Sequence, residues 1–265
     1  MKQKLTLAIA GLGTVGAGTL KLLETHRALL SARCGRPIEV VAISARDRSR
    51  DRGVSLDGYK WFDDPVDMAR DSGADVVVEL IGGSEGPARD VCDAAIAAGR
   101  HVVTANKALV ALHGSNLAAR AEAANVTLAF EAAVAGGIPV IKALREGLAG
   151  NRVSSLHGIL NGTCNYILTT MRETGRPFED VLAEAQTLGY AEADPSFDID
   201  GVDAAHKLAI LTSVAFGCEV DFEGVHIEGI RHIAAEDIAY ATELGYRIKL
   251  LGITERTKAG VLQRV

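Results

Sequence analysis

The chain has 265 residues, of which 48% are hydrophobic and 23% charged, and its formal net charge is -6 at pH 7. These values are typical of a soluble globular protein with one large domain or two smaller ones. The negative charge and the lack of basic runs argue against a nucleic-acid-binding protein, and no apolar run reaches the roughly 20 residues that cross a membrane. The amino-terminal segment lacks a secretory cleavage site and the four cysteines form no CxxC pair, so we expect a cytoplasmic protein with free thiols.

An apolar run at residues 5–10 is followed directly by glycines at G-x-G-x-x-G spacing. The pattern predicts a strand, a tight turn and a helix, with the pyrophosphate of a dinucleotide at the amino terminus of that helix. A glycine-rich turn is a weak signal alone, but its place between a strand and a helix is the one that a Rossmann-type fold requires. The expected cofactor-binding residues of this turn are Gly11, Leu12, Gly13, Thr14, Val15 and Gly16.

A second strand is expected at residues 38–43, and the residues after it bear on the choice of cofactor. An acid at this point binds the ribose hydroxyls of NAD, whereas an arginine pairs with the 2′-phosphate of NADP. The segment carries Arg46 next to Asp47, which favours NADP and leaves NAD open. Alternatively, Arg46, Arg48 and Arg50 are solvated charges of a loop.

The pattern then alternates between helices and strands, as in an open parallel sheet. We expect helices at residues 66–70, 87–98 and 115–125, and strands at residues 75–80, 101–104 and 127–130. Ligands of such sheets bind beyond the carboxyl ends of the strands, so Gly82 and Lys107 should face the same cofactor crevice as the glycine turn. Lys107 would contact the carboxamide, a phosphate or the substrate there, or else it caps the following helix.

The second half mixes helices and strands without strict alternation. Expected helices cover residues 140–148, 165–173, 178–188, 202–216 and 235–244, and expected strands cover residues 153–160, 227–230, 246–254 and 261–265. We therefore predict an α/β protein, with an amino-terminal Rossmann-type parallel-sheet domain at residues 1–134 and a second, α+β domain at residues 135–265.

Residues 189–207, GYAEADPSFDIDGVDAAHK, carry five acids and end on Lys207. Pro195 and Gly201 keep the first part out of a helix, and the pattern becomes helical after Gly201. Asp203 and Lys207 then lie one helical turn apart. A lysine beside a carboxylate suits proton transfer to or from a substrate oxygen, but a solvated acidic loop with a surface ion pair explains this stretch alone equally well.

Five motifs, GLGTVG, TANK, EAAVAGGIP, LNGTCNYIL and GYAEADPSFDIDGVDAAHK, occur in this order, and together they resemble homoserine dehydrogenase from residue 5 to about residue 255. The last two motifs are specific, whereas the glycine turn alone is not. Enzymes of that family interconvert L-homoserine and L-aspartate 4-semialdehyde with NAD or NADP, on the route to threonine, methionine and isoleucine. The resemblance implies that the second domain is catalytic and forms a homodimer through its sheet.

The resemblance also implies catalytic roles. Lys207 would be the acid/base that moves the hydroxyl proton, Asp203 would orient it, and Lys107 would lie near the nicotinamide and the substrate. Arg46 would bind the adenosine end of the cofactor. A lysine amine is charged at neutral pH and Asp203 favours that form, so we expect proton donation in aldehyde reduction near neutrality and proton acceptance in alcohol oxidation at alkaline pH.

The remaining implied residues bind the substrate and a cation. Glu192 would receive the substrate ammonium and Asp198 its hydroxyl side, while the amides of Gly162 and Thr163 suit its carboxylate. A monovalent cation such as sodium, structural in role, would be held largely by backbone oxygens of Glu131, Val134, Gly136 and Ile138.

Two expectations concern the limits of the resemblance. The chain stops at Val265 inside a strand-like run where family members continue, so we expect a truncated chain without a domain for threonine feedback. The rival functions are another two-domain NAD(P)-dependent amino-acid or semialdehyde dehydrogenase, and an NAD(P)H-binding sensor without turnover. An aspartate-semialdehyde dehydrogenase needs a cysteine nucleophile, for which Cys164 is the candidate.

Overall fold

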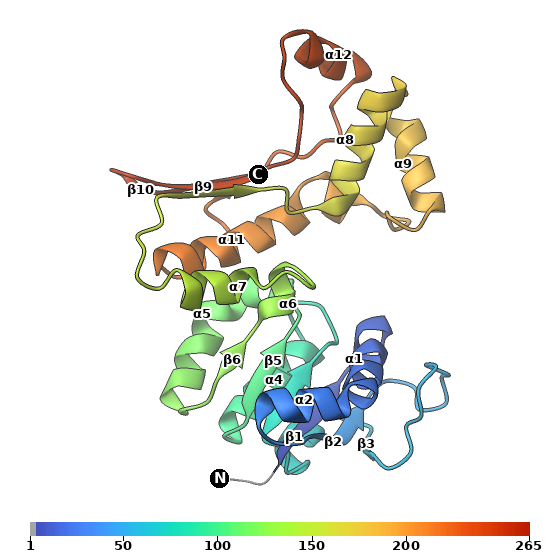
Figure 1. The fold of residues 1–265 in the computed structure, drawn as a ribbon, viewed down its shortest axis with the longest axis vertical. Helices are drawn as coiled ribbons and strands as arrows, with labels where there is room; N and C mark the ends of the chain where they lie inside the picture. Colours follow the sequence, from blue (N-terminus) through green and yellow to red (C-terminus); the bar gives the residue numbers. More distant parts are fainter. Residues whose placement is uncertain (1–3) are drawn as a thin grey trace. The chain divides into compact units, whose positions relative to one another are not determined.

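The computed structural model of the chain describes residues 4–265 (Figure 1). The chain divides into two compact units, Met1–Val140 and Ile141–Val265. This division lies six residues beyond the predicted domain boundary. Within residues 4–265, no helix combines the length and apolar character needed to cross a membrane.

The first unit is built on a six-stranded parallel sheet. Its strands are β1 (Leu5–Ala10), β2 (Ile38–Ser44), β3 (Lys60–Phe62), β4 (Val76–Glu79), β5 (His101–Thr104) and β6 (Leu128–Ala129). They lie in the order β3-β2-β1-β4-β5-β6, and each neighbouring pair is parallel. The strand order reverses between β1 and β4, which is where a doubly wound sheet binds its ligand.

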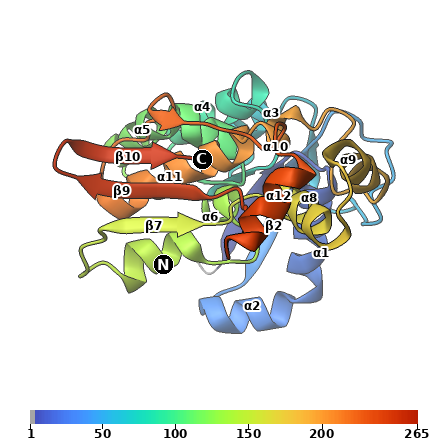
Figure 2. The ribbon, with the colours of Figure 1, turned by 90° about the horizontal axis from the view of Figure 1, so that it is seen from above.

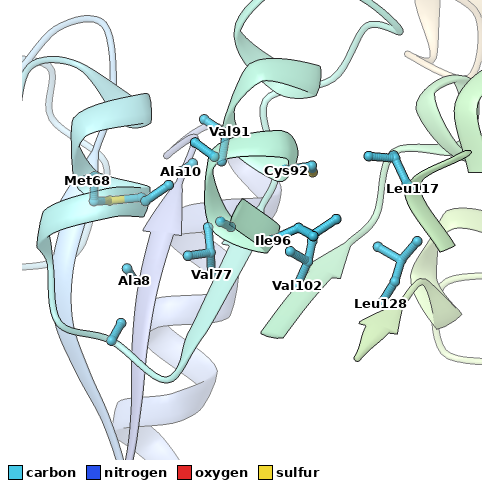
Figure 3. Packing of buried hydrophobic residues seen from close by; sticks show 14 of the residues in the cluster. Ala8, Ala10, Met68, Val77, Val91, Cys92, Ile96, Val102, Leu117 and Leu128 are labelled. Atoms are coloured by element: carbon cyan, nitrogen blue, oxygen red, sulfur yellow. The ribbon is translucent and has the colours of Figure 1, made fainter. Parts of the chain in front are cut away.

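Alternate side chains of β1 point to opposite faces of the sheet and pack into two separate cores. Ala8 and Ala10 pack on one side against helices α3 and α4, whereas Leu7 and Ile9 pack on the other side with Leu20 of α1. Figure 3 shows the first of these cores, around Val77 and Val102. The helices of this unit are α1 (Thr14–Thr25), α2 (Arg27–Cys34), α3 (Pro65–Asp71), α4 (Pro87–Ala97), α5 (Lys107–Ala123) and α6 (Glu131–Val134).

The second unit contains a smaller mixed sheet. Its strands are β7 (Ser155–Gly158), β8 (Val225–His226), β9 (Gly252–Thr257) and β10 (Gly260–Arg264). The order is β7-β9-β10-β8, with antiparallel pairs except for β10 and β8, and Figure 2 shows β7, β9 and β10 side by side. A parallel sheet in one unit and a mainly antiparallel sheet in the other confirm the predicted fold class.

One helix of the second unit covers this sheet. The apolar face of α11 (Val202–Phe216), with Ala205 and Leu208, packs against Leu156 of β7 and Val225 of β8. The other helical segments are α7 (Val140–Lys142), the π-helical turn η1 (Ala143–Gly147), α8 (Gly162–Thr174), α9 (Phe178–Thr187), α10 (Ser196–Ile199) and α12 (Ala235–Glu243).

Several predicted elements are wrong in extent. The helix expected from residue 115 begins at Lys107, because the Asn106 side chain caps it by accepting a 3.1 Å hydrogen bond from the Leu109 amide. Asn106, and not Lys107, is therefore the helix cap. The strand expected at 227–230 is absent: β8 ends at His226, and the Ile230 amide donates to the Ile199 carbonyl oxygen at 2.7 Å, next to α10 and not in a strand pair.

Other differences arise from short or irregular segments. The strand expected from residue 246 begins only at Gly252. Helix α2 was not predicted as separate from α1, and it has no buried residue that would mark a face of its own. The three-residue strand β3 was not predicted because it is too short to show a period.

Candidate active site

The glycine turn has the geometry that the dinucleotide-binding pattern predicts. Gly11 has φ +94°, and a Cβ there would lie 2.5 Å from the Leu80 carbonyl oxygen. A Cβ on Gly16 would lie 2.0 Å from the Gly11 carbonyl oxygen, so the helix can approach the strand closely only with glycine at this position. Gly13 precedes α1, is exposed and faces open space, and Val15 in the first turn of α1 is also exposed. The first amides of α1 thus offer donors for a pyrophosphate.

An arginine that the sequence did not single out ties the next loop to this turn. The guanidinium of Arg52 donates to the carbonyl oxygen of Leu12 at 3.0 Å and to that of Arg50 at 2.6 Å, and also to that of Asp47. Leu12 belongs to the glycine turn, so Arg52 fixes the arginine-rich loop against it. The two residues lie 40 positions apart, and no local pattern marks such a contact.

The two residues that bear on cofactor choice differ in their surroundings. The carboxylate of Asp47 accepts hydrogen bonds from the Ser49 amide at 2.8 Å and the Ser49 hydroxyl at 2.7 Å, which lower the pKa of Asp47. Arg46 is exposed. One oxygen of the acid, Oδ1, is therefore engaged in its own turn, and both side chains are exposed.

A buried carboxylate joins the ends of β4 and β5. Glu79 is fully buried, and it accepts hydrogen bonds from the amides of Ile81 at 2.7 Å and Gly82 at 3.2 Å and from the Thr104 hydroxyl at 2.6 Å. Of the two residues predicted to face the cofactor crevice, Gly82 lies on the loop after β4, and Lys107 is the first residue of α5, which follows β5. Sequence reasoning missed Glu79 because it ends an apolar run and reads as a strand residue.

In the second unit, Lys207 and Asp203 form a sheltered ion pair on α11. The Lys207 amine lies 2.7 Å from Asp203 Oδ2 and also donates to the carbonyl oxygen of Leu160 at 2.9 Å. The side chains of Lys207 and Asp203 are 18% and 5% exposed. The interpretation of this pair as a surface ion pair is therefore wrong.

Asn161 connects this pair to a second carboxylate. Its amide nitrogen donates to Asp203 Oδ2 at 2.9 Å and to Asp198 Oδ1 at 2.8 Å, while its oxygen accepts from the Cys164 amide at 2.8 Å and so caps α8. A neutral donor between two carboxylates reduces their mutual repulsion. The sequence predicted a sharp turn at Asn161 but not this bridging role.

These groups line a hollow of about 520 Å³ at the amino terminus of α8, a volume within the range of small-molecule sites. The Thr163 hydroxyl holds one wall by donating to the Tyr190 carbonyl oxygen at 2.8 Å. Sequence reasoning did not identify the two tyrosines that line it. The lining residues are Asn161, Gly162, Thr163, Tyr166, Gly189, Tyr190, Asp198, Asp203 and Lys207.

The other acids of the 189–207 stretch have different surroundings. Asp200 pairs with the Arg231 guanidinium through two 2.9 Å hydrogen bonds, which lower the pKa of Asp200. Asp194 accepts from the Ser196 amide at 3.1 Å, and hydrogen bonds with Ser196 lower its pKa. Glu192 is exposed and is not among the residues that line the hollow, so its contact with a substrate stays a prediction.

Cys164 is poorly suited to nucleophilic catalysis. Its side chain is buried, its thiol donates to the Asp198 carbonyl oxygen at 3.2 Å, and burial raises its pKa to about 12. Since the thiolate is the nucleophile, this environment disfavours a mechanism of the aspartate-semialdehyde dehydrogenase type. The four cysteines, Cys34, Cys92, Cys164 and Cys218, are free.

The residues predicted to hold a monovalent cation lie around α6. Glu131 and Val134 are its first and last residues, and the Ile138 carbonyl oxygen accepts from the Val140 amide at 2.8 Å. Carbonyls at the end of so short a helix lack intrahelical partners, which suits a cation bound by backbone oxygens. Within residues 4–265, no group of three or more His, Cys, Asp or Glu side chains is arranged to hold a metal ion.

Comparison with known proteins assigns both units to one family. Residues 11–131 match the model of the homoserine dehydrogenase NAD binding domain, and residues 139–265 match the model of homoserine dehydrogenase. The chain belongs to the homoserine dehydrogenase family. A homoserine dehydrogenase of Pseudomonas aeruginosa is 53% identical over 261 residues, which are 98% of this chain and 59% of that protein.

Solved structures of homoserine dehydrogenases share the fold. A crystal structure of the enzyme from Thiobacillus denitrificans matches with a TM-score of 0.95 and 53% identity, over 99% of this chain and 60% of that chain. A hyperthermophilic archaeal homoserine dehydrogenase in complex with NADPH matches with a TM-score of 0.81 and 26% identity, over 98% of this chain and 81% of that chain. The chain thus spans about three fifths of the length of the Pseudomonas and Thiobacillus relatives.

Proposed function

We propose that this chain carries the cofactor- and substrate-binding parts of a homoserine dehydrogenase, which interconverts L-homoserine and L-aspartate 4-semialdehyde with NAD(P). The observation that carries the proposal is the Lys207 amine on the wall of the hollow, held at 2.7 Å by the buried Asp203. A sheltered lysine with two fixed acceptors suits proton exchange with a substrate hydroxyl.

The protein supplies the proton transfer of this reaction. A lysine amine has three N–H donors, and in Lys207 two of them point to Asp203 and to the Leu160 carbonyl oxygen. The third is then directed to the substrate oxygen: the charged amine donates a proton when the aldehyde is reduced, and the neutral amine accepts one when the alcohol is oxidised. NAD(P), bound at the glycine turn, supplies or accepts the hydride. Lys107 is proposed to lie near the nicotinamide and the substrate.

The substrate is an amino acid zwitterion, and the hollow is lined by carboxylates, by the Lys207 amine and by the first residues of α8. The carboxylate of Asp198 and the amides of Gly162 and Thr163, at the capped start of α8, all line it. We propose that these amides bind the substrate carboxylate, that Asp198 contacts its hydroxyl side, and that Glu192 receives its ammonium from the exposed loop.

NADP is the preferred cofactor in this proposal. Arg46 is exposed and Ser49 engages one oxygen of Asp47, so the loop offers a cation for a 2′-phosphate while the acid already has a hydrogen-bond partner in its own turn. The archaeal relative in complex with NADPH has the same fold. The other proposed cofactor contacts, the glycine turn and Gly82, serve either nucleotide.

Turnover tests the proposal directly. The absorbance of reduced nicotinamide is followed after L-homoserine is added to the purified chain with NADP and, separately, with NAD. We expect reduction of both or of NADP alone, at a rate that rises towards alkaline pH. A chain that binds the nucleotide but reduces none with L-homoserine would instead be a sensor, and the proposal would fail.

A thiol reagent separates the proposal from the semialdehyde dehydrogenase alternative. Alkylation modifies the exposed Cys34 and Cys218 first, so the Cys164→Ser variant is the sharper test. We expect this variant to keep homoserine oxidation within a few-fold of the wild type, because the thiol plays no part in proton or hydride transfer. Complete loss of activity in a folded variant would favour cysteine catalysis.

Three further properties complete the proposal. We infer a homodimer through the sheet of the second unit, because Ile159, Leu251 and Leu262 are exposed apolar residues on or beside its strands, and light scattering in solution tests this.

We infer a structural sodium or potassium ion at Glu131, Val134, Gly136 and Ile138. A lower unfolding temperature in a buffer whose only cation is too large for the site would support this. Four free thiols suit a reducing compartment, so we infer a cytoplasmic location, which fractionation of cells would test.

A further inference from the structure

Glu79 is a buried acid whose surroundings suggest a function beyond packing. It is fully buried at the carboxyl end of β4, and its three hydrogen-bond donors are two backbone amides and one hydroxyl, none of which is charged. Burial of a carboxylate is costly unless its oxygens are satisfied. Here both oxygens are used, Oε1 by Ile81 and Gly82 and Oε2 by Thr104.

These hydrogen bonds belong to a closed ring that spans two loops. The Thr104 oxygen accepts from the Asn106 amide at 2.9 Å, and the Asn106 side chain donates back to the Gly83 carbonyl oxygen. Asn106 also caps α5, whose first residue is Lys107. One carboxylate therefore sets the positions of the loop after β4, the loop after β5 and the start of α5.

The ring lies against the glycine turn. A Cβ on Gly11 would come within 2.9 Å of the Ile81 nitrogen, so the backbone that Glu79 holds is the backbone that Gly11 contacts. In a doubly wound sheet, β1 to β3 serve one mononucleotide half of the cofactor and the following strands serve the other half. Glu79 is on the side of β4 and β5, which corresponds to the nicotinamide half.

We propose that Glu79 is a positioning residue for the nicotinamide half of the cofactor, acting through the amides of Ile81 and Gly82 and through the start of α5. This inference rests on the proposed function. It predicts that loss of Glu79 weakens binding of the whole dinucleotide but not of its adenosine end, because Arg46, which is proposed to bind that end, lies after β2 and outside the hydrogen-bonded ring.

A matched control lies at the opposite end of the same strand segment. Asp75 Oδ2 accepts from the Thr6 amide at 3.1 Å and the Thr6 hydroxyl at 2.8 Å, beside the amino end of β4. It is a carboxylate that joins two neighbouring strands of this sheet, as Glu79 is, but on the edge away from the cofactor. Glu79→Ala and Asp75→Ala thus remove similar structural links, and only the first removes a link at the crevice.

The experiment measures dissociation constants of NADPH and of adenosine 2′,5′-bisphosphate by calorimetry for the full chain and each variant. We expect Glu79→Ala to weaken NADPH binding by about 10-fold or more and bisphosphate binding by less than about 2-fold, since hydrogen bonds to a charged group are lost only at the nicotinamide side. Asp75→Ala should change neither. Glu79→Gln should recover part of the loss, because its amide oxygen still accepts from Ile81 and Gly82.

Equal weakening of both ligands, or an effect no larger than that of Asp75→Ala, would show that Glu79 is only structural. If Glu79→Ala does not fold, the same two dissociation constants are measured for Thr104→Val, with the same expected results. This change removes the hydroxyl that donates to Glu79 and accepts from Asn106, and it keeps the shape of the side chain. A wild-type chain that binds NADPH without oxidising L-homoserine would overturn the proposed function and leave this test valid. A wild-type chain that binds no NADPH would overturn both.

Discussion

The two units use a buried acid in opposite ways. In the first unit, Glu79 accepts from amides and a hydroxyl, and its hydrogen bonds fix the backbone of two loops. In the second unit, Asp203 accepts from Asn161 and from the charged amine of Lys207, and it fixes a side chain. The same functional group therefore fixes the backbone of two loops in one place and a lysine side chain in the other.

The partner of each acid decides what its loss would affect. Lys207 lines the hollow, so the pair that contains Asp203 can exchange a proton with a ligand. The donors to Glu79 are parts of the fold, so their loss should change binding and not chemistry. Variants of Asp203 and Lys207 should consequently lower kcat, and variants of Glu79 should raise the dissociation constant of the cofactor.

The largest effect is expected for Lys207→Ala. Loss of the acid/base group should lower kcat for L-homoserine by about 10³-fold or more, whereas NADPH binding stays unchanged. Lys249→Ala is the control, because Lys249 also makes two hydrogen bonds, at 2.7 Å to Asn165 and 2.9 Å to Thr169, and does not line the hollow. Wild-type turnover in the Lys207→Ala variant would contradict a role of Lys207 in proton transfer.

The next effect belongs to the glycine turn. In Gly16→Ala the new methyl group would lie 2.0 Å from the Gly11 carbonyl oxygen, so the turn must open. We expect about 100-fold weaker NADPH binding and unchanged geometry at Lys207. Gly18→Ala, on the same helix with nothing within 4 Å, should instead stabilise the protein by up to about 1 kcal/mol. Titration calorimetry and urea unfolding distinguish these results.

Asn161→Asp tests the bridge between the two carboxylates of the hollow. The change replaces the donor with a third acid, so Asp198 and Asp203 lose their shared partner and repel the new group. We expect kcat to fall by about 10- to 100-fold with little change in NADPH binding. Asn165→Asp adds the same charge one turn later on α8, at a residue that does not line the hollow and that accepts a 2.7 Å hydrogen bond from Lys249, so kcat should change by less than about 3-fold. Equal losses in both variants would point to a general charge effect.

The smallest effect is expected for an exposed ion pair of the second unit, which serves as a comparison for the buried Asp203. Asp200 is also paired with a cation, but its side chain is 42% exposed. Its pKa is lowered in the fold, so its contribution to stability is present above its ordinary value of 3.8 and is lost as the pH falls below that value. Asp200→Asn should lower the free energy of unfolding by less than about 1 kcal/mol near neutral pH and by nothing in strong acid. A deficit that persisted in strong acid would mean that packing, not charge, explains it.

The sequence alone indicated those features that local spacing determines. The glycine turn lies within six residues, Asp203 and Lys207 lie one helical turn apart, and the alternation of strands and helices gave the parallel sheet. Asn161 was placed in a turn, but its hydrogen bonds reach 37 and 42 residues along the chain, and no period marks them. Such contacts depend on how the strands pair and not on neighbouring residues.

Errors in the predicted elements have the same origin. The start of α5 was placed at residue 115 because its apolar pattern is weak, although the Asn106 cap defines the true start at Lys107. Glu79 was read as part of a strand, and its role depends on a second strand 25 residues away. The acidic stretch could be interpreted correctly only once burial separated Asp203 from its exposed neighbours.

The central claim is that the Lys207 amine exchanges a proton with the substrate hydroxyl. A crystal structure of the chain with NADP and L-homoserine measures this most directly. We predict that the amine lies about 3 Å from the hydroxyl oxygen, within hydrogen-bond distance, and that the carbon bearing this oxygen faces the nicotinamide ring. A substrate bound with its hydroxyl away from Lys207, or a Lys207 amine directed into solvent, would contradict the claim.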